Sequence, residues 1–145
     1  MPDLVICNTS PLFYLYQLGH LDVLQKLYGH IVVPEAVVSE LKAGQAQGEH
    51  VPDISAYPWM AVRSVRIPWL VRLITDFGAG EAEVLALALE EPHSLVILDD
   101  RLAREVARLQ NLRMTGTAGI LVKAKHKGFI SAVAPLLNNL LQLGF

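Results

Sequence analysis

Residues 94–101, Ser-Leu-Val-Ile-Leu-Asp-Asp-Arg, constrain the possible fold of this chain more than any other stretch. Four apolar residues follow one another without alternation, as in a strand whose two faces are both covered in a parallel sheet. Two carboxylates, Asp99 and Asp100, end the run. A helical pattern begins directly afterwards, with apolar residues spaced to line one face: Leu102, Val106 and Leu109. The order of strand, acids and helix is typical of an α/β unit.

Asp99 and Asp100 stand where open α/β sheets bind their ligands, in the crevice beyond the carboxyl ends of the strands. Paired acids at this point indicate a divalent cation, because hard cations prefer carboxylate oxygens. A helix N-cap is the competing interpretation, since aspartate is a favoured capping residue. For this stretch alone the cap is the better supported of the two, and the choice depends on acids elsewhere in the chain.

Composition limits the class of protein. A chain of 145 residues with 52% hydrophobic residues is long enough to bury a core, and we expect one domain over residues 1–145. No apolar run is long enough to cross a bilayer, and the first residues do not resemble a signal peptide. The single cysteine, Cys7, lies in an apolar run and is expected to be a buried small hydrophobe. These features predict a cytoplasmic protein that does not associate with membranes.

The charge of the chain is unevenly distributed. The formal net charge of −2 gives no global nucleic-acid signature. Ten of the twelve Lys and Arg residues nevertheless lie beyond residue 62, with clusters in 101–113 and 123–127. These clusters are expected to be solvated helix faces, and a modest phosphate-contacting surface is the alternative.

Strand and helix patterns alternate along the chain. Strands are predicted at 4–7, 31–33, 60–65, 95–98 and 112–114, and a surface loop at 43–58. Helices are predicted from Ser10, from 21 to Gly29, and over 36–42, 68–76, 81–90, 117–125 and 133–141, with Ser10 as the first N-cap. This alternation predicts a three-layer α/β/α sandwich, with a central, mainly parallel sheet and right-handed crossovers.

Acid and amide side chains are expected to meet at one edge of that sheet. Asn8 follows the first strand, and Glu40 shares a helix stripe with Ala36 and Val37. Glu81 opens a helix and faces inward, whereas Glu83 is interpreted as compensation of the helix dipole. Converging acids repel one another unless a cation lies among them. Such a cluster, with Asp99 and Asp100, supports phosphodiester hydrolysis assisted by Mg²⁺ or Mn²⁺.

Five motifs together resemble the PIN-domain family, in particular a prokaryotic branch. They are Asn8-Thr9-Ser10-Pro11-Leu12, Val33-Pro34-Glu35-Ala36-Val37 leading to Glu40-Leu41, Gly78-Ala79-Gly80-Glu81-Ala82-Glu83, Leu98-Asp99-Asp100-Arg101, and Thr115-Gly116-Thr117. They span nearly the whole chain in the family's order. The resemblance implies a metal-dependent ribonuclease, often the toxin of a toxin–antitoxin pair. Its partners would be RNA and an antitoxin protein, and we also expect a homodimer.

The resemblance also implies roles for individual residues. It places metal binding on Glu40, Glu81 and Asp100, with Asp99 as a neighbour, and catalysis on the same acids together with Asn8. Thr9 and Ser10 would supply hydroxyls near the site, and substrate contacts are expected from three further residues: Arg101, Thr115 and Thr117. Amide groups at the helix start after Gly116 can bind phosphate, and an ordinary Ser/Thr cap is the alternative.

Asn8 departs from the family pattern, because PIN nucleases usually end their first strand in an aspartate. An amide oxygen still ligates a hard cation, but the site loses one negative charge. The alternative function is therefore a catalytically weak or inactive PIN-like domain that binds nucleic acid or a protein partner. A phosphoacceptor receiver domain is set aside, because such domains carry their acid pair after the first strand, where this chain has Asn8 and Thr9.

Overall fold

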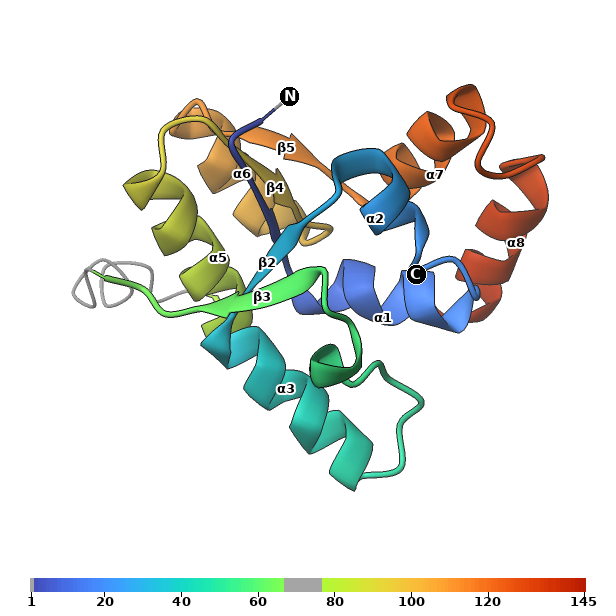
Figure 1. Ribbon diagram of the computed structural model, residues 1–145, viewed down its shortest axis with the longest axis horizontal. Helices are drawn as coiled ribbons and strands as arrows, with labels where there is room; N and C mark the ends of the chain where they lie inside the picture. Colours follow the sequence, from blue (N-terminus) through green and yellow to red (C-terminus); the bar gives the residue numbers. More distant parts are fainter. Residues whose placement is uncertain (1, 67–76) are drawn as a thin grey trace.

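Five parallel strands form the centre of the protein (Figure 1). They are β1 (Leu4–Cys7), β2 (Ile31–Pro34), β3 (Met60–Arg63), β4 (Ser94–Ile97) and β5 (Arg113–Thr115), in the order β3-β2-β1-β4-β5. This computed structural model describes residues 2–66 and 77–145. Every residue of β2 and β4 is buried, as expected for apolar runs covered on both faces. The edge strand β3 exposes three of its four residues.

Helices cover both faces of the sheet. On one face α5 (Ala79–Glu90) packs on β1, β2 and β4, and α6 (Arg101–Leu109) packs beside it on β5. On the other side in Figure 1 lie α1 (Thr9–Gln17), α2 (Val23–Tyr28) and α7 (Thr117–His126), with α8 (Ala134–Gln142) outermost. The helix α3 (Glu35–Ala46) contacts both α1 and α5. The predicted three-layer α/β/α sandwich is confirmed.

No helix in residues 2–66 and 77–145 is long and apolar enough to cross a bilayer. The two longest helices that bear on the site, α3 and α5, have 12 residues each. A membrane-spanning helix needs about 20 apolar residues. The helix expected over residues 68–76 lies outside the described residues.

Two helix boundaries differ from the sequence-based expectation. The first helix begins at Thr9, so Asn8 rather than Ser10 is its N-cap residue. The third helix continues to Ala46, into the stretch expected to be a loop, and that stretch also contains the short 3-10 helix η1 (Ile54–Ala56). Gly44 lies buried within α3 because the Glu49 side chain crosses close over its backbone: a Cβ at Gly44 would be 2.6 Å from Glu49 Oε2.

Only part of the apolar stripe predicted for α6 faces the core: Val106 packs against it, and the two leucines do not. Leu102 is 57% exposed and Leu109 is 77% exposed, whereas Ala103 and Ala107 are fully buried. The expectation that the leucines mark the packed face of this helix was wrong. Alanine side chains allow α6 to lie close to β5 and α5, and the larger leucines would not fit in that space.

The helix α5 holds α3 in place through a carboxylate. Glu83 Oε1 accepts a hydrogen bond of 2.9 Å from the backbone N–H of Ala36, in the first turn of α3. The first N–H groups of a helix have no partner within the helix, so this contact satisfies one of them. Glu83 was expected to compensate the dipole of its own helix. It compensates the N-terminus of the neighbouring helix instead.

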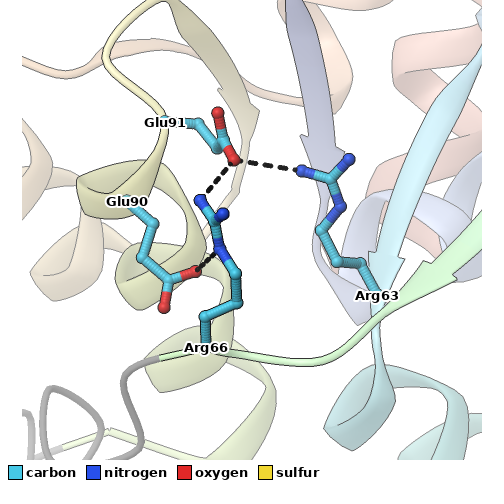
Figure 2. Close-up of polar contacts among 4 residues, drawn as sticks. All are labelled: Arg63, Arg66, Glu90 and Glu91. Atoms are coloured by element: carbon cyan, nitrogen blue, oxygen red, sulfur yellow. Dashed lines mark hydrogen bonds and ion pairs between the residues drawn. The ribbon is translucent and has the colours of Figure 1, made fainter.

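At its other end, α5 is joined to the edge strand by ion pairs (Figure 2). Glu91 Oε1 lies 3.3 Å from Arg63 Nη1 and 2.9 Å from Arg66 Nη2. Arg66 Nε is also 3.8 Å from Glu90 Oε2, on a side chain that is only 2% exposed. The arginines are largely exposed, so each pair contributes little by itself. Together they fix the C-terminal end of the helix whose N-terminal turn carries Glu81 and Glu83.

The cap from Glu83 predicts a measurable loss of stability. Glu83→Ala should lower the free energy of unfolding by about 1 kcal/mol, the usual cost of losing a helix cap. Glu83→Gln keeps an oxygen acceptor and should lose less. The matched control is Glu105→Ala, which removes only an exposed pair with Arg108 on α6. Urea unfolding followed by circular dichroism measures all three, and equal stability of the Glu83→Ala and Glu105→Ala proteins would contradict the cap.

Candidate functional site

The candidate site lies at the carboxyl edge of the sheet, between β1 and β4. The ladder continues past the ends of both strands: Asn8 N–H donates to Ile97 O at 3.0 Å, and Leu98 N–H donates to Thr115 O at 2.9 Å. From β1 the chain first runs to β2 on one side and later returns to β4 on the other. Ligands of open α/β sheets bind at this kind of switch in strand order.

The side chains of Asn8 and Glu40 both approach Gly80, at the place where a Cβ would be. Asn8 is 1% exposed, and its Oδ1 accepts no hydrogen bond from any residue in the described parts of the chain. A Cβ added at Gly80 would lie 3.1 Å from Asn8 Oδ1 and would collide with Glu40 Oε1. Glycine is therefore required here, because a side chain would fill the space into which the two oxygens point.

Glu81 joins this pair from the other side of Glu40. A Cβ added at Gly78 would lie 2.7 Å from Glu81 Oε2 and 3.8 Å from Glu40 Oε2. Both carboxylates are half-buried. Glu40 is also fixed from α1, because the Thr9 hydroxyl donates to Glu40 Oε1 at 2.6 Å. Three residues predicted from the sequence to share a site thus come together, from β1, α3 and α5.

The oxygens of Asn8, Glu40 and Glu81 suit a hard divalent cation. The unpaired amide oxygen of Asn8 is buried beside carboxylate oxygens, and an acceptor in that position gains from a positive charge. Among the described residues no three His, Cys, Asp or Glu side chains gather closely enough to hold a metal ion. The set of Asn8, Glu40 and Glu81 contains only two acids, because its third member, Asn8, is an amide. A cation such as Mg²⁺ is commonly held by one or two carboxylates and several waters, which fits two acids and an amide.

Asp99 is engaged by α7. Its Oδ1 accepts a 2.7 Å hydrogen bond from Thr117 N–H, and its Oδ2 accepts one of 2.6 Å from the Thr117 hydroxyl. Thr117 is fully buried. Asp99 thus caps the first turn of the helix that follows Gly116. The Ser/Thr cap offered as an interpretation of this turn is not formed, because the N-cap residue is Gly116 and the Thr117 hydroxyl donates to Asp99. A role for Asp99 beside the metal stays a prediction.

Asp100 acts as the N-cap of α6. Its Oδ2 accepts a hydrogen bond of 3.0 Å from Ala103 N–H, and the residue is exposed. The capping interpretation of this acid is therefore confirmed. The cap occupies one carboxylate oxygen and leaves the other, so the metal-ligand role expected for Asp100 stays a prediction.

A hollow in the surface adjoins Asp99. It has a volume of about 330 Å³, and its lining includes Arg104, Thr115, Gly116 and Phe145. Arg104 Nη1 donates to Leu98 O at 2.9 Å and would lie 2.9 Å from a Cβ at Gly116. Its guanidinium is thus fixed beside the sheet edge, whereas Arg101, the predicted substrate contact, is an exposed residue at the start of α6.

Cys7 lies next to the site but does not take part in it. Burial raises the pKa of its thiol well above the usual value, and the negative charge of Asp99 raises it further. The thiol is therefore protonated at neutral pH, the form that is a poor nucleophile. The sequence-based interpretation of Cys7 as a buried small hydrophobe is confirmed, since the residue is 0% exposed.

Sequence reasoning missed several residues that shape this region. Gly78 and Gly80 were treated as the opening of a helix, although their missing side chains make room for the carboxylates. Arg104 was grouped with the surface bases. Phe13 and Glu49 were not considered, yet both line a hollow of about 200 Å³ next to Glu40. A larger cavity of about 580 Å³, between α3, η1 and β3, contains no member of the Asn8–Glu40–Glu81 set.

Comparison with known proteins gave one match. A family model described as a PIN domain matches residues 4–145, which is nearly the whole chain. Neither the curated proteins nor the solved structures gave a match.

The contact between Asp99 and Thr117 predicts a clear difference between two conservative substitutions. Thr117→Val has nearly the same shape but removes the buried hydroxyl donor, so the free energy of unfolding should fall by about 1–3 kcal/mol. Thr117→Ser keeps the hydroxyl and is the matched control, which loses only a methyl group. Urea unfolding at neutral pH measures both. If the valine protein is as stable as the serine protein, the hydrogen bond to Asp99 does not stabilise the fold.

Proposed function

The chain belongs to the PIN-domain family, a nuclease-type fold, and from this premise we propose that it is a Mg²⁺- or Mn²⁺-dependent ribonuclease that hydrolyses RNA phosphodiester bonds. PIN domains generally use divalent metal ions. The observation that supports the proposal best is the buried Oδ1 of Asn8, which has no partner among the described residues and faces the Glu40 carboxylate. Glu81 stands on the other side of Glu40.

We assign metal binding and positioning roles to individual residues of the site. Glu40, Glu81 and Asn8 would hold the cation through oxygen atoms. When bound, a divalent cation supplies activation of a water molecule and neutralises charge that develops on the phosphate. Thr9 keeps Glu40 in position through its 2.6 Å hydrogen bond. Gly78 and Gly80 keep the space between these groups free of side chains.

Binding of RNA is proposed to use groups on the β4–β5 side of the site. The guanidinium groups of Arg104 and Arg101 would attract phosphates, and the hydroxyls of Ser10 and Thr115 would contact the substrate. Each phosphate contact releases a counterion, so such binding weakens as salt rises. Asp99, together with Thr117, would hold the start of α7 in place beside the bound strand.

The finer biological role is also part of the proposal. We infer a toxin of a toxin–antitoxin pair that acts in the cytoplasm and is bound by an antitoxin protein. An antitoxin would cover exposed side chains of this chain, and two exposed leucines, Leu102 and Leu109, lie on α6. A homodimer remains a prediction of the same kind, and the oligomeric state in solution tests it.

A second candidate function is supported by a specific residue. Asn8 puts an amide where the family usually has an aspartate, and the site then holds two acids rather than three. A domain with this change would bind nucleic acid or a protein partner and cleave RNA weakly or not at all.

Metal-dependent cleavage is the direct test. The protein should cut single-stranded RNA with Mn²⁺ or Mg²⁺ and stop when the metal is chelated. Glu40→Gln keeps the shape of the side chain and removes its charge, so the rate should fall about 100-fold or more, on the order of one lost metal-site interaction. Glu105→Gln, on the exposed face of α6, is the matched control and should keep the rate. Equal rates for the two variants would exclude Glu40 from the site.

Asn8→Asp tests whether the asparagine at position 8, where the family usually has an aspartate, weakens metal binding and cleavage. The added carboxylate should tighten Mn²⁺ binding and raise metal-dependent cleavage. At an effective dielectric near 20, two unit charges about 4 Å apart interact by roughly 4 kcal/mol, and desolvation and repulsion from Glu40 offset most of this. We therefore expect a gain of about fivefold, which corresponds to about 1 kcal/mol.

The stability of the same variant provides a second measurement. Without metal, Asn8→Asp should lower the melting temperature through repulsion between neighbouring acids, and Mn²⁺ should reverse the loss. Calorimetric titration and thermal melts with and without Mn²⁺ measure the two effects. A variant that binds Mn²⁺ no better than the original protein, while Glu40→Gln still abolishes cleavage, would mean that position 8 does not face the metal.

A further inference from the structure

The hollow next to Glu40 has the size of a single ring system. It lies between α1 and α3, which contact each other, and the segment after α3 closes it. Its volume is about 200 Å³. Pockets for drug-sized ligands run from roughly 300 to 1,000 Å³, so this one would hold a base but not a whole nucleotide.

The hollow adjoins the candidate metal site through Glu40. Glu40 and Thr9 both line it, and the 2.6 Å hydrogen bond between them forms part of its wall. Glu40 Oε1 is also the carboxylate atom that lies near Asn8 Oδ1 beside Gly80. Glu40 is therefore shared between the hollow and the set that it forms with Asn8 and Glu81. A base held in the hollow would place the phosphate of its own nucleotide near that set.

Aromatic side chains form another part of the lining. Phe13 and Tyr14 are half-buried and stand edge to face, with ring centroids 5.1 Å apart at 78°. Tyr14 packs in the same way against Phe145, at 5.0 Å and 85°. The rings are thus held in place before any ligand binds. Stacking on aromatic side chains is the usual way in which proteins hold an unpaired base.

Glu49 adds a carboxylate to the lining. Its backbone N–H donates to Gly44 O at 2.9 Å, and its side chain crosses over Gly44, where a Cβ would lie 2.6 Å from Oε2. Glu49 is an exposed residue, and within residues 2–66 and 77–145 its carboxylate accepts no hydrogen bond, so it is accessible to a ligand. Both charged groups of the hollow, Glu40 and Glu49, are acceptors. A ligand that replaces water at Glu49 has to supply hydrogen-bond donors, and a phosphate would be repelled.

The base-pairing edge of guanine matches the Glu49 carboxylate better than the same edge of any other base. A carboxylate accepts two parallel hydrogen bonds, and guanine presents N1–H and N2–H side by side. Adenine and cytosine each offer one amino group on that edge, next to a ring nitrogen that would face the second oxygen. Uracil places its single N–H between two carbonyl groups, which would face the carboxylate. The same edge forms the base pair in a duplex, so only an unpaired guanine can bind.

We propose that the hollow between α1 and α3 is a specificity pocket for one unpaired guanine, next to the phosphodiester bond that is cut. The rings of Phe13 and Tyr14 pack against the base, and Glu49 selects it. The proposal rests on the ribonuclease function proposed above. It names the substrate class as single-stranded RNA that contains guanine.

The first experiment measures cleavage by the full-length protein with Mn²⁺. Four single-stranded oligonucleotides differ only in one central nucleotide, which is G, A, C or U, within an otherwise identical sequence that lacks G. Cleavage next to G should be at least about tenfold faster than next to U, the cost of one unmatched hydrogen-bonding edge. Glu49→Gln should reduce the ratio of the G rate to the U rate to near one. Glu105→Gln is the matched control and should keep the ratio. Equal rates on all four oligonucleotides with the original protein would overturn the proposal.

The second experiment does not depend on cleavage. Binding of guanosine 5′-monophosphate and of uridine 5′-monophosphate is measured by saturation-transfer NMR and titration without metal, with thermal melts to confirm that each variant is folded. The guanosine nucleotide should bind at least about fivefold more tightly. Glu49→Gln should remove most of this difference, whereas Phe13→Ala should weaken the binding of both nucleotides. No preference for the guanosine nucleotide would refute the pocket. If that preference depends on Glu49 but no RNA is cut with any metal, the pocket stands and the ribonuclease function fails.

Discussion

The contact between α3 and α5 is the constraint on which the candidate site depends. Two residues of α5 maintain it in different ways. Gly80 has no side chain, so α5 can lie close to the Asn8 and Glu40 oxygens, which approach the place where a Cβ would be. Glu83, one turn further along, accepts the Ala36 N–H and so fixes where α3 begins. Glu40 lies on α3 and Glu81 on α5, and the distance between the two acids is therefore set by this one contact.

Carboxylates around the sheet edge serve two different purposes. Asp99, Asp100 and Glu83 accept backbone N–H groups at the starts of α7, α6 and α3. These acids stabilise helix N-termini, where negative charge is favourable in any case. Glu40 and Glu81 instead accept no backbone N–H group in the described parts of the chain, although Glu81 lies in the first turn of α5, and Asn8 beside them has a buried oxygen without a partner among the described residues. The contrast separates acids that build the fold from acids that are available for a ligand.

Much of this arrangement could be predicted from the sequence, because apolar periodicity and strand ends are local signals. The unalternating run before Asp99 predicted a buried strand, and the order of elements predicted the sandwich. The inward direction of Ala36 and Val37 placed Glu40 near the sheet edge. Packing was harder to predict. The exposed leucines of α6 and the buried alanines between them depend on how closely this helix approaches β5, and no pattern within the helix shows that distance.

The helix caps were also hard to predict, because they depend on contacts between elements. A sequence shows that Asp100 precedes a helix and that Glu83 lies in one, but not which N–H groups each carboxylate meets. Asp100 caps the next residues in the chain, as local reasoning suggested. Glu83 accepts the N–H of Ala36, 47 positions earlier in the chain, a contact that only the tertiary structure reveals. The role of Gly78 and Gly80 was equally hard to predict, because the space that they leave is filled by side chains from distant parts of the chain, Glu40 on α3 and Asn8 after β1.

The hydrogen bond from Ala36 to Glu83 also links the site to the dynamics of the protein. Any motion that opens α5 away from α3 frees the Ala36 amide and separates Glu40 from Glu81 in the same step. The hydrogen bond at Ala36 and the closeness of the two acids therefore depend on the same contact between α3 and α5. A cation that binds only the closed arrangement would slow hydrogen exchange at Ala36, although that amide touches no ligand. One backbone N–H thus becomes a reporter of how often the site is formed.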